Sequence, residues 1–368
     1  MPSGKLIIKV LTRLAPVALV ALAISAAGHA ETFTLRVGAG HPASGTVYSE
    51  AMHTFLVPEL KRRVASETEH ELRIIEGYGG SIASVAETLE AVQIGILDIG
   101  GFCTCFEPAK LFLHNFQYFV PFGPQDAQSA ITISRRVYDQ HPWLVEELQS
   151  KYNQTLVALN GFDNYHLGTV EPWHDIRDLQ GVKIAGAGPN LPWLEFAGVV
   201  PVQSSLPDGY MAMSTGVYSG WLMYPSSYFA YKFHEPSPNY TLIGFGAMGG
   251  AAIITMNQRS MDRLPSKVRN IIREVGLEYE SWAAKLLDQR QTEGLTNLKE
   301  VGATIHTLAP EVRLQWAKSL QDFPNAMAQE ANSRNLPGSE ILQTYIRQIG
   351  QSGHELPVPY HIEASTSP

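Results

Sequence analysis

Segments with the pattern of β-strands alternate with segments that have the pattern of helices, and this order limits the folds open to the chain. Residues 32–38 alternate apolar and polar side chains, as a half-buried strand does, and residues 71–76 and 97–101 read as further strands. Between them, residues 49–67 and 84–94 place apolar side chains on one side of a helix. Strands that alternate with helices predict parallel βαβ units, so we expect an α/β fold.

The pattern continues with other spacings through the rest of the chain. Residues 155–160, 183–185 and 251–256 have the pattern of strands, and a long helical pattern runs from residue 265 to about residue 298. The chain has 368 residues, of which 45% are hydrophobic and 17% charged. That length favours two domains or one large α/β unit, and that composition is typical of a globular protein.

Two predicted helices contain a residue that disfavours helix. Pro58 lacks a backbone N–H and is expected to kink or split the helix over 49–67. Gly276 is a weak helix former and is expected to interrupt the long helix that begins near residue 265.

Residues 1–30 have the order of a secretory signal peptide. Lys5, Lys9 and Arg13 give a basic start, an apolar run follows over 14–27, and small residues lie at the end of the segment. The apolar run is short for a membrane span, so a membrane anchor is the less favoured alternative. We expect export to the periplasm and cleavage near Ala30.

The charge of the remaining chain excludes one class of partner. The first 30 residues carry three basic side chains and no acidic one, so the rest has 24 basic and 35 acidic residues and a formal net charge of −11. Affinity for nucleic acids comes from neutralising phosphates with Lys and Arg, so an acidic protein is a poor nucleic-acid binder.

Two cysteines, Cys103 and Cys105, are too few for a disulfide framework in a chain of this size. If both lie on a strand, their side chains point to the same face with Cα atoms near the upper limit for a disulfide. We expect two small buried apolar side chains rather than a disulfide or a metal pair.

The sequence lacks the common motifs of catalysis. It has no phosphate-binding loop, no dinucleotide-binding glycine spacing, no metalloprotease or zinc-finger spacing, and no Gly-x-Ser-x-Gly nucleophile elbow. We therefore expect no cofactor, no metal site and no enzymatic activity. An exported enzyme that uses other chemistry remains the alternative.

Four motifs, in order, carry a resemblance to a known family. They are GGSIASVAETLEAVQIGILDI (79–99), NGFDNYH (160–166), PWHDIRDLQGVKI (172–184) and YMAMSTGVYSG (210–220). In these segments the chain resembles the substrate-binding component of tripartite ATP-independent periplasmic (TRAP) transporters, of the dicarboxylate-binding type. The resemblance covers about residues 33–320.

This resemblance implies a two-lobed periplasmic binding protein fold of the type II kind, with mixed sheets joined by crossing strands and a long helix spanning both lobes. One lobe is expected from residues 31–160 and about 245–275, and the other from 161–244 and the C-terminal helices to about 350. Residues 353–368 are expected to form a loosely ordered tail. The resemblance also implies a small-molecule ligand, closure of the lobes over it by hinge motion, and the membrane subunits of a TRAP transporter as partners.

The chain departs from the family at the residues that bind ligand carboxylates. Family members usually carry an Arg after the Lys-Ile of the third motif, where this chain has Ala185, and a second Arg at the position of Tyr165. After Gly220 the family often has polar residues, whereas this chain has Trp221, Leu222, Met223 and Tyr224. We expect Ala185 and Tyr165 to line the cleft and to change the class of ligand.

Three interpretations of the altered cleft stay open. Another group, such as Lys183, His41 or His166, holds an anion; a larger flat ligand stacks on Trp221, Tyr224 or Phe106; or the ligand is neutral or cationic. The candidate ligand-binding residues are His41, Glu87, Phe106, Asn164, Tyr165, Lys183, Ala185, Trp221, Met223 and Tyr224.

The sequence therefore predicts an extracytoplasmic solute-binding protein that delivers a small organic molecule to a TRAP-type transporter. An organic anion with an apolar or aromatic body is the expected ligand. The alternatives are an exported enzyme and a ligand-binding sensor partner that use the same two-lobed fold.

Overall fold

The computed structural model describes residue 1 and residues 30–364, and the predicted signal peptide falls almost entirely outside them. Five strands form the first sheet: β1 (Thr32–Ala39), β2 (Glu71–Gly77), β3 (Ile99–Cys103), β4 (Gln154–Phe162) and β10 (Met248–Asn257). Their order is β2-β1-β3-β10-β4; β1 is parallel to β2 and β3, and β10 is antiparallel to β3 and β4.

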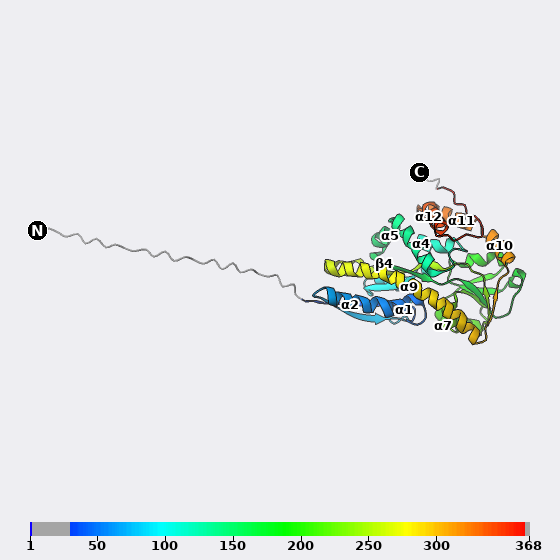
Figure 1. Cartoon of the computed structure of the whole chain (residues 1–368), viewed down its shortest axis with the longest axis horizontal. Coiled ribbons are helices and arrows are strands. Elements are labelled where there is room, and N and C mark those ends of the chain that lie inside the picture. The colour runs from blue at the N-terminus through cyan, green and yellow to red at the C-terminus, as the bar shows by residue number, and fades with distance from the viewer. Residues whose placement is uncertain (2–29, 365–368) are drawn as a thin grey trace.

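Six strands form the second sheet: β5 (His166–Thr169), β6 (Lys183–Gly186), β7 (Val200–Gln203), β8 (Gly220–Met223), β9 (Asn239–Leu242) and β11 (Thr304–Thr307). Their order is β11-β9-β5-β8-β6-β7. Strand β6 is parallel to β7 and β8, and β5 is antiparallel to β8 and β9. Two mixed sheets in two lobes confirm the predicted fold class (Figure 1).

Helices surround both sheets. Those in the chain around the first sheet are α1 (Val47–Ala51), the π-helix η1 (Met52–Leu56), α2 (Val57–Glu67), α3 (Thr88–Gln93), η2 (Thr104–Phe106), η3 (Leu113–Phe119), α4 (Ala127–Gln140), α5 (Trp143–Tyr152) and α8 (Gln258–Asp262). Those between the strands of the second sheet are η4 (Ile176–Leu179), η5 (Leu191–Ala197), α6 (Leu206–Ser214) and α7 (Pro225–Ala230). The chain ends with α9 (Ser266–Glu300), α10 (Pro310–Ser319), α11 (Phe323–Ser333) and α12 (Gly338–Gln351).

The first predicted helix is split, as expected from Pro58. Residues Val57–Glu67 form α2 with Pro58 in its first turn, and the five residues before it form the π-helix η1. Proline has no N–H to donate to the carbonyl of Thr54, four residues earlier, so regular α-helix cannot continue through this turn.

The long helix α9 runs unbroken through Gly276, so the predicted interruption is wrong. A Cβ atom at position 276 would lie 2.1 Å from the carbonyl oxygen of Val157 in β4. Near its other end, a Cβ at Gly294 would lie 2.8 Å from the carbonyl group of Pro225 in α7. Both glycines let one continuous helix approach an element of each lobe closely.

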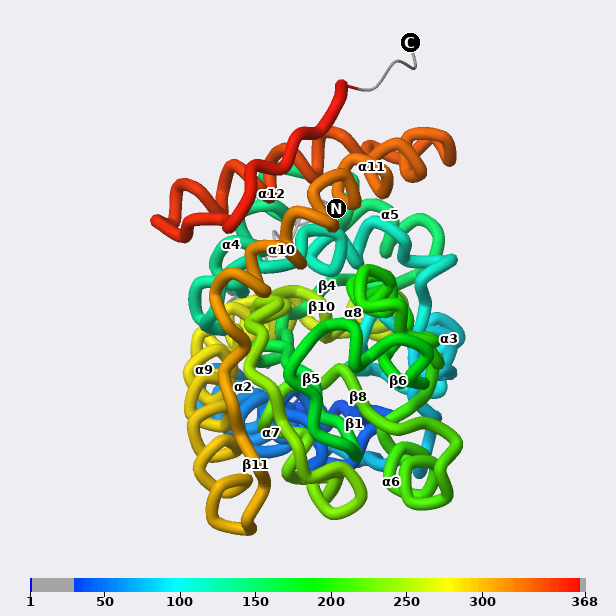
Figure 2. Tube along the Cα trace, turned by 90° about the vertical axis from the view of Figure 1, so that its right-hand side faces the viewer, coloured from blue at the N-terminus to red at the C-terminus, as the bar shows by residue number. Residues whose placement is uncertain are grey.

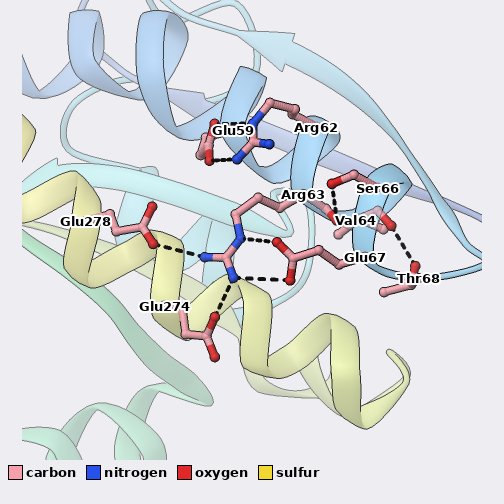
Figure 3. Close-up of polar contacts among 9 residues, drawn as sticks. All are labelled: Glu59, Arg62, Arg63, Val64, Ser66, Glu67, Thr68, Glu274 and Glu278. Carbon is pink, nitrogen blue, oxygen red and sulfur yellow. Dashed lines mark hydrogen bonds and ion pairs between the residues drawn. The ribbon is translucent and has the colours of Figure 1, made fainter.

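Ion pairs fix α9 to the first lobe. Arg63 of α2 reaches Glu274 at 2.5 Å and Glu278 at 3.0 Å, both on α9 (Figure 3). Deeper in the lobe, the buried carboxylate of Glu280 pairs with Arg135 of α4 and accepts a hydrogen bond from the backbone N–H of Leu159 at 2.7 Å. These ion pairs tie the first half of α9 to the first lobe.

Two short segments cross between the sheets. Residues 163–165 lead from β4 to β5, and residues 243–247 lead from β9 back to β10. Backbone hydrogen bonds join them, from the Tyr165 N–H to the Gly246 carbonyl and from the Phe245 N–H to the Tyr165 carbonyl, each 3.1 Å long. Together with α9 and the return from β11 through α10 to the C-terminal helices, these segments are the covalent connections between the lobes.

The C-terminal helices depart from the predicted division into lobes. Helix α12 lies beside α4 in the Cα trace (Figure 2) and packs against α4 and η3, which belong with the first sheet. The ring of Tyr345 lies 4.9 Å from that of Phe116. Its amphipathic sequence buries one apolar face, and that face meets the first lobe rather than the second.

The tail is also better ordered than expected as far as residue 364. His354 lies 3.0 Å from the carbonyl oxygen of Phe122, and the Tyr360 hydroxyl donates to the carbonyl of Pro121 at 2.8 Å. Val358, Tyr360 and Ile362 are buried, so apolar contacts hold the segment on the first lobe.

Candidate functional site

Strands from both sheets end at one small cavity between the lobes. His41 follows β1, Phe106 follows β3, Ala187 follows β6 and Tyr224 follows β8. In α/β proteins, ligands bind at the carboxyl ends of parallel strands, because loops of variable sequence meet there. This position makes the cavity the candidate ligand-binding site.

Residues from both lobes line the cavity. They are His41, Cys105, Phe106, Phe162, Tyr165, Ala187, Ser204, Leu206, Trp221, Leu222, Met223 and Tyr224. The cavity volume is about 20 Å³, which is room for about one water molecule.

Aromatic rings form much of the wall. The rings of Phe162 and Tyr224 stack 5.1 Å apart, and the ring of Tyr165 meets that of Tyr224 edge-on at 5.1 Å. Phe106 lies 5.9 Å from the ring of His41, on the side of the first lobe. Such walls favour a flat apolar ligand, because stacked or edge-on rings add to the burial of apolar area.

His41 brings an imidazole to this wall. It is 2% exposed; its Nδ1 lies 2.6 Å from the hydroxyl oxygen of Tyr48, and its Nε2 has no hydrogen-bond partner. Burial disfavours the charged imidazolium and lowers the pKa of His41 to about 4. Near neutral pH, His41 is therefore an uncharged side chain with a free ring nitrogen.

The Tyr165 hydroxyl takes part in a chain of hydrogen bonds behind the cavity. It lies 3.2 Å from the hydroxyl of Tyr118, and the backbone carbonyl of Tyr118 accepts from the indole N–H of Trp193 at 2.8 Å. Burial raises the pKa of Tyr165 well above its usual value, so the phenol stays neutral.

No acidic or basic side chain, apart from neutral His41, is among the lining residues in the described part of the chain. Within residues 30–364 there is also no group of three or more His, Cys, Asp or Glu side chains that could hold a metal ion. The arrangement offers shape, aromatic faces and one imidazole nitrogen, and the residues present form no nucleophile–base pair.

A larger hollow of about 460 Å³ lies elsewhere, between α1, α7 and α9. It is open to solvent, and its charged groups Glu50 and Glu293 are both paired with Arg290. Each of these charged groups already has a partner in the protein and the hollow excludes little water, so we place the ligand site in the smaller cavity at the strand ends.

A family comparison agrees with this geometry. Residues 45–330 match the family described as bacterial extracellular solute-binding protein, family 7. The chain belongs to this family. Its members are exported receptors that bind solutes without transforming them, so the predicted non-enzymatic receptor is confirmed.

Solved structures of TRAP solute-binding proteins share the fold of this family 7 receptor. One, from an unidentified microbe of a marine metagenome, is specific for aromatic acids and holds 3-hydroxybenzoate; it is 19% identical, with a TM-score of 0.77 over 88% of this chain and 99% of that one. Another, from Rhodoferax ferrireducens, holds copurified benzoate; it is 17% identical, with a TM-score of 0.76 over 87% of this chain and 98% of that one.

A third, a Bordetella pertussis receptor, binds pyroglutamic acid; it is 21% identical, with a TM-score of 0.71 over 85% of this chain and 99% of that one. The predicted membership in the TRAP receptor family, with a small-molecule ligand and membrane subunits as partners, is confirmed at the level of the family. Within the described residues, no helix is both long and apolar enough to cross a bilayer.

The two positions at which family 7 receptors usually carry arginine differ in their placement here. Tyr165 lines the cavity, as expected. Ala185 does not: it lies fully buried within β6, opposite Trp221 in β8, while Ala187, two residues further along, reaches the cavity.

The other predicted residues divide into two groups. Of the predicted ligand-binding residues, Phe106, Trp221, Met223 and Tyr224 line the cavity together with His41 and Tyr165. Glu87, Asn164 and Lys183 are not among its lining residues.

These three residues have other surroundings. The exposed Glu87 accepts hydrogen bonds from the backbone and hydroxyl of Ser84 at the start of α3. Asn164 accepts from the Gly246 N–H at 2.9 Å and donates to Gln125, so it binds the crossing segments together. Lys183 is exposed at the end of β6 that lies away from the cavity.

His166, a further candidate anion holder, also lies at the crossing. Its Nδ1 accepts hydrogen bonds from the backbone N–H groups of Ile243 and Gly244, both at 3.1 Å. Burial lowers the pKa of His166 to about 3, so it is a neutral structural acceptor.

Sequence reasoning missed six lining residues: Cys105, Phe162, Ala187, Ser204, Leu206 and Leu222. Phe162 could have been predicted, because this residue belongs to the NGFDNYH motif. Ser204 and Leu206 follow β7, a strand that has no clear alternation of apolar and polar residues.

The expectation for the two cysteines is wrong. Cys103 and Cys105 form a disulfide, with Cα atoms 5.1 Å apart, and both are buried as expected. The prediction was based on an extended strand through both cysteines. Instead, the chain turns into η2 after Cys103, and this turn brings the two cysteine Cα atoms closer together. The disulfide places Cys105 in the wall of the cavity.

The lobes are closed in this structure. Across the interface, the Ser227 hydroxyl donates to the Gly45 carbonyl at 2.9 Å and the Trp193 indole donates to the Tyr118 carbonyl. Pockets that hold small ligands have volumes of roughly 300–1,000 Å³. A cavity of about 20 Å³ must widen, by parting of the lobes or movement of the rings, before a solute can enter.

Proposed function

We propose that this family 7 receptor binds a small organic monoacid with an aromatic or apolar body in the cavity between its lobes, and hands it to the membrane subunits of a TRAP transporter. The observation that carries the proposal is the composition of the wall. It combines aromatic rings with a single neutral imidazole and contains no arginine.

A dicarboxylate fits this wall poorly. Burying two carboxylates without cationic partners costs several kcal/mol for each charge, because the low dielectric of the cavity replaces water. A monoacid brings only one such group, and its ring gains contacts with Phe162 and Tyr224 that are worth about 0.5–1.5 kcal/mol per aromatic pair beyond area burial.

Relatives of the same fold support this ligand class. Two of them hold 3-hydroxybenzoate and benzoate. At 17–19% identity, these relatives share the fold with this chain. We therefore infer an aromatic acid from the lining residues of this chain, and their ligands agree with that inference.

We further propose that the receptor acts in the periplasm after cleavage near Ala30. The basic start, apolar run and small residues of the first 30 positions support cleavage there. Mass spectrometry of protein isolated from the periplasm should give an N-terminus at or near Glu31, and an intact Met1 on a membrane-bound form would contradict the proposal.

Calorimetry of the periplasmic protein tests the ligand class. The panel is benzoate, 3-hydroxybenzoate and pyroglutamate against succinate, malate and fumarate. We expect binding of at least one aromatic acid at micromolar or tighter Kd, and weak or no binding of the C4-dicarboxylates. A thermal-shift screen gives the same ranking, since a ligand at about 100 times its Kd adds roughly 2.7 kcal/mol of stability.

The opposite ranking would overturn the proposal. Micromolar binding of succinate, malate or fumarate, without binding of the aromatic acids, would mean that another cation compensates for the missing arginines.

A further inference from the structure

One polar atom of the cavity wall lacks a partner inside the protein. Among the buried side-chain nitrogen and oxygen atoms without hydrogen bonds in residues 30–364, Nε2 of His41 is the one that belongs to a lining residue. The other ring nitrogen of His41 is engaged by Tyr48 at 2.6 Å, which fixes the orientation of the ring. Nε2 is thus the unpartnered polar atom among the described lining residues, available to a ligand group once the cavity widens.

The charge balance of the cavity is the second observation. A monoacid is an anion near neutral pH, and the wall of this site has no lysine or arginine to pair with it. The imidazole is the group in the wall that can gain a positive charge, and it can do so only by taking up a proton. Closure of the lobes around an uncompensated carboxylate would be strongly unfavourable.

We propose that the cleft binds an organic monoacid together with one proton from the solvent, held between the ligand carboxyl group and Nε2 of His41. The filled cavity is then neutral overall, whether the proton resides on the imidazole or on the carboxyl oxygen. This inference rests on the proposed function and specifies how the same site accepts an acid.

The groups around His41 leave the imidazole as the site of proton uptake. Tyr48 of α1 contacts it, and Tyr165 and Tyr224 line the same cavity. Burial raises the pKa of all three hydroxyls, so they stay neutral between pH 5.5 and 8. Glu87 lies on the solvent side of the loop next to Gly40 and is bonded to Ser84. Burial lowers the pKa of free His41 to about 4, so near neutral pH the proton is taken up from the solvent only when the ligand binds.

One further titratable group lies nearby. Asp163 is buried and accepts hydrogen bonds from the backbone and hydroxyl of Ser226, and burial raises its pKa to about 7. It is not a lining residue, so we expect its protonation to be independent of the ligand.

Calorimetry with benzoate and 3-hydroxybenzoate tests the inference on the unmodified periplasmic protein. Titrations at pH 7 in phosphate and in Tris, which differ in ionisation enthalpy, give the number of protons taken up. We expect uptake of close to one proton per ligand bound. The affinity should rise by up to tenfold for each unit by which the pH falls from 8 to 5.5. Equal binding enthalpies in both buffers and an affinity independent of pH would overturn the inference while leaving the proposed function in place. Failure of every aromatic acid to bind would instead overturn the proposed function.

Two variants assign the proton to His41. His41→Gln keeps an amide in place of the ring but cannot titrate, and we expect at least tenfold weaker binding and no proton uptake. Asp163→Asn is the matched control, since an amide oxygen can still accept from Ser226, and its proton uptake should equal that of the unmodified protein. Uptake that persists in His41→Gln, or disappears in Asp163→Asn, would show that His41 does not hold the proton.

Discussion

Gly276 offers a sharp test of how the long helix is seated on the first lobe. In isolation, replacing a helical glycine by alanine stabilises a helix by about 1 kcal/mol, because alanine loses less backbone entropy. In this protein the new Cβ would lie 2.1 Å from the carbonyl oxygen of Val157. That oxygen belongs to the backbone of β4 and cannot rotate away as a side chain would.

The expected effect of Gly276→Ala is the difference between these two contributions. Overpacking a well-packed site typically costs 1–3 kcal/mol, and a clash with sheet backbone should lie near the upper end of about 3 kcal/mol. Subtracting about 1 kcal/mol of helix propensity leaves a net destabilisation of about 2 kcal/mol.

Gly350→Ala is the matched control. Gly350 lies in α12, and a Cβ there meets no atom within 4 Å, so the same substitution should be neutral or stabilise by up to about 1 kcal/mol. Urea unfolding followed by circular dichroism gives both values from the midpoints. If Gly276→Ala were as stable as Gly350→Ala, the close approach of α9 to β4 would be refuted.

Two further predictions concern single side chains. Glu280→Ala should destabilise the protein by about 3 kcal/mol in urea unfolding, because it leaves a buried backbone N–H without a partner and Arg135 with only the exposed Asp139, 3.6 Å away. Glu278→Ala, at an exposed ion pair, should cost less than about 1 kcal/mol. Similar losses for both would contradict the assignment of a buried role to Glu280. In calorimetry, Trp221→Ala should weaken aromatic-acid binding by at least about tenfold, or about 1.4 kcal/mol. Tyr231→Ala should weaken it less, since Trp221 lines the cavity and Tyr231 does not. A larger loss for Tyr231→Ala would place the ligand elsewhere.

The strands of the first lobe could be predicted from the sequence, because they have clear patterns of apolar and polar residues. The apolar and polar alternation over 32–38 and the buried run over 251–256 correspond to β1 and β10, and Pro58 marked the break before α2. These features are local, so they appear in a single sequence without a structure.

The second lobe was harder to predict, for a physical reason. Its strands β5, β7, β8 and β9 are four residues long, and two of them, β5 and β8, are buried throughout. A strand that is buried on both faces has no alternation, and four residues are too few to distinguish a strand from a loop. The disulfide of Cys103 and Cys105 escaped prediction because it depends on a turn between them.

The site was predicted in its aromatic part and not in its geometry. Trp221, Met223 and Tyr224 follow one another in the chain, and the resemblance placed them at the cleft. Glu87 and Asn164 are polar residues in the same motifs, yet their hydrogen bonds hold a helix start and the lobe crossing. A motif shows which residues belong to the family pattern, whereas only packing shows which of them face the ligand.

A tyrosine rather than an arginine at position 165 also affects the empty receptor. An arginine enclosed without an anion costs several kcal/mol, so a cleft that holds one resists closing until the ligand arrives. Tyr165 is neutral and lies among Tyr118, Trp193 and Tyr224, so the empty cleft can close without that cost. We therefore expect Tyr165→Arg to shift the empty protein toward an open form in which water reaches the guanidinium, while Tyr165→Phe stays closed. Small-angle scattering without ligand measures this directly: the radius of gyration should be larger for the Arg variant than for the Phe variant, and equal values for two folded variants would show that charge in the cleft does not control its closure.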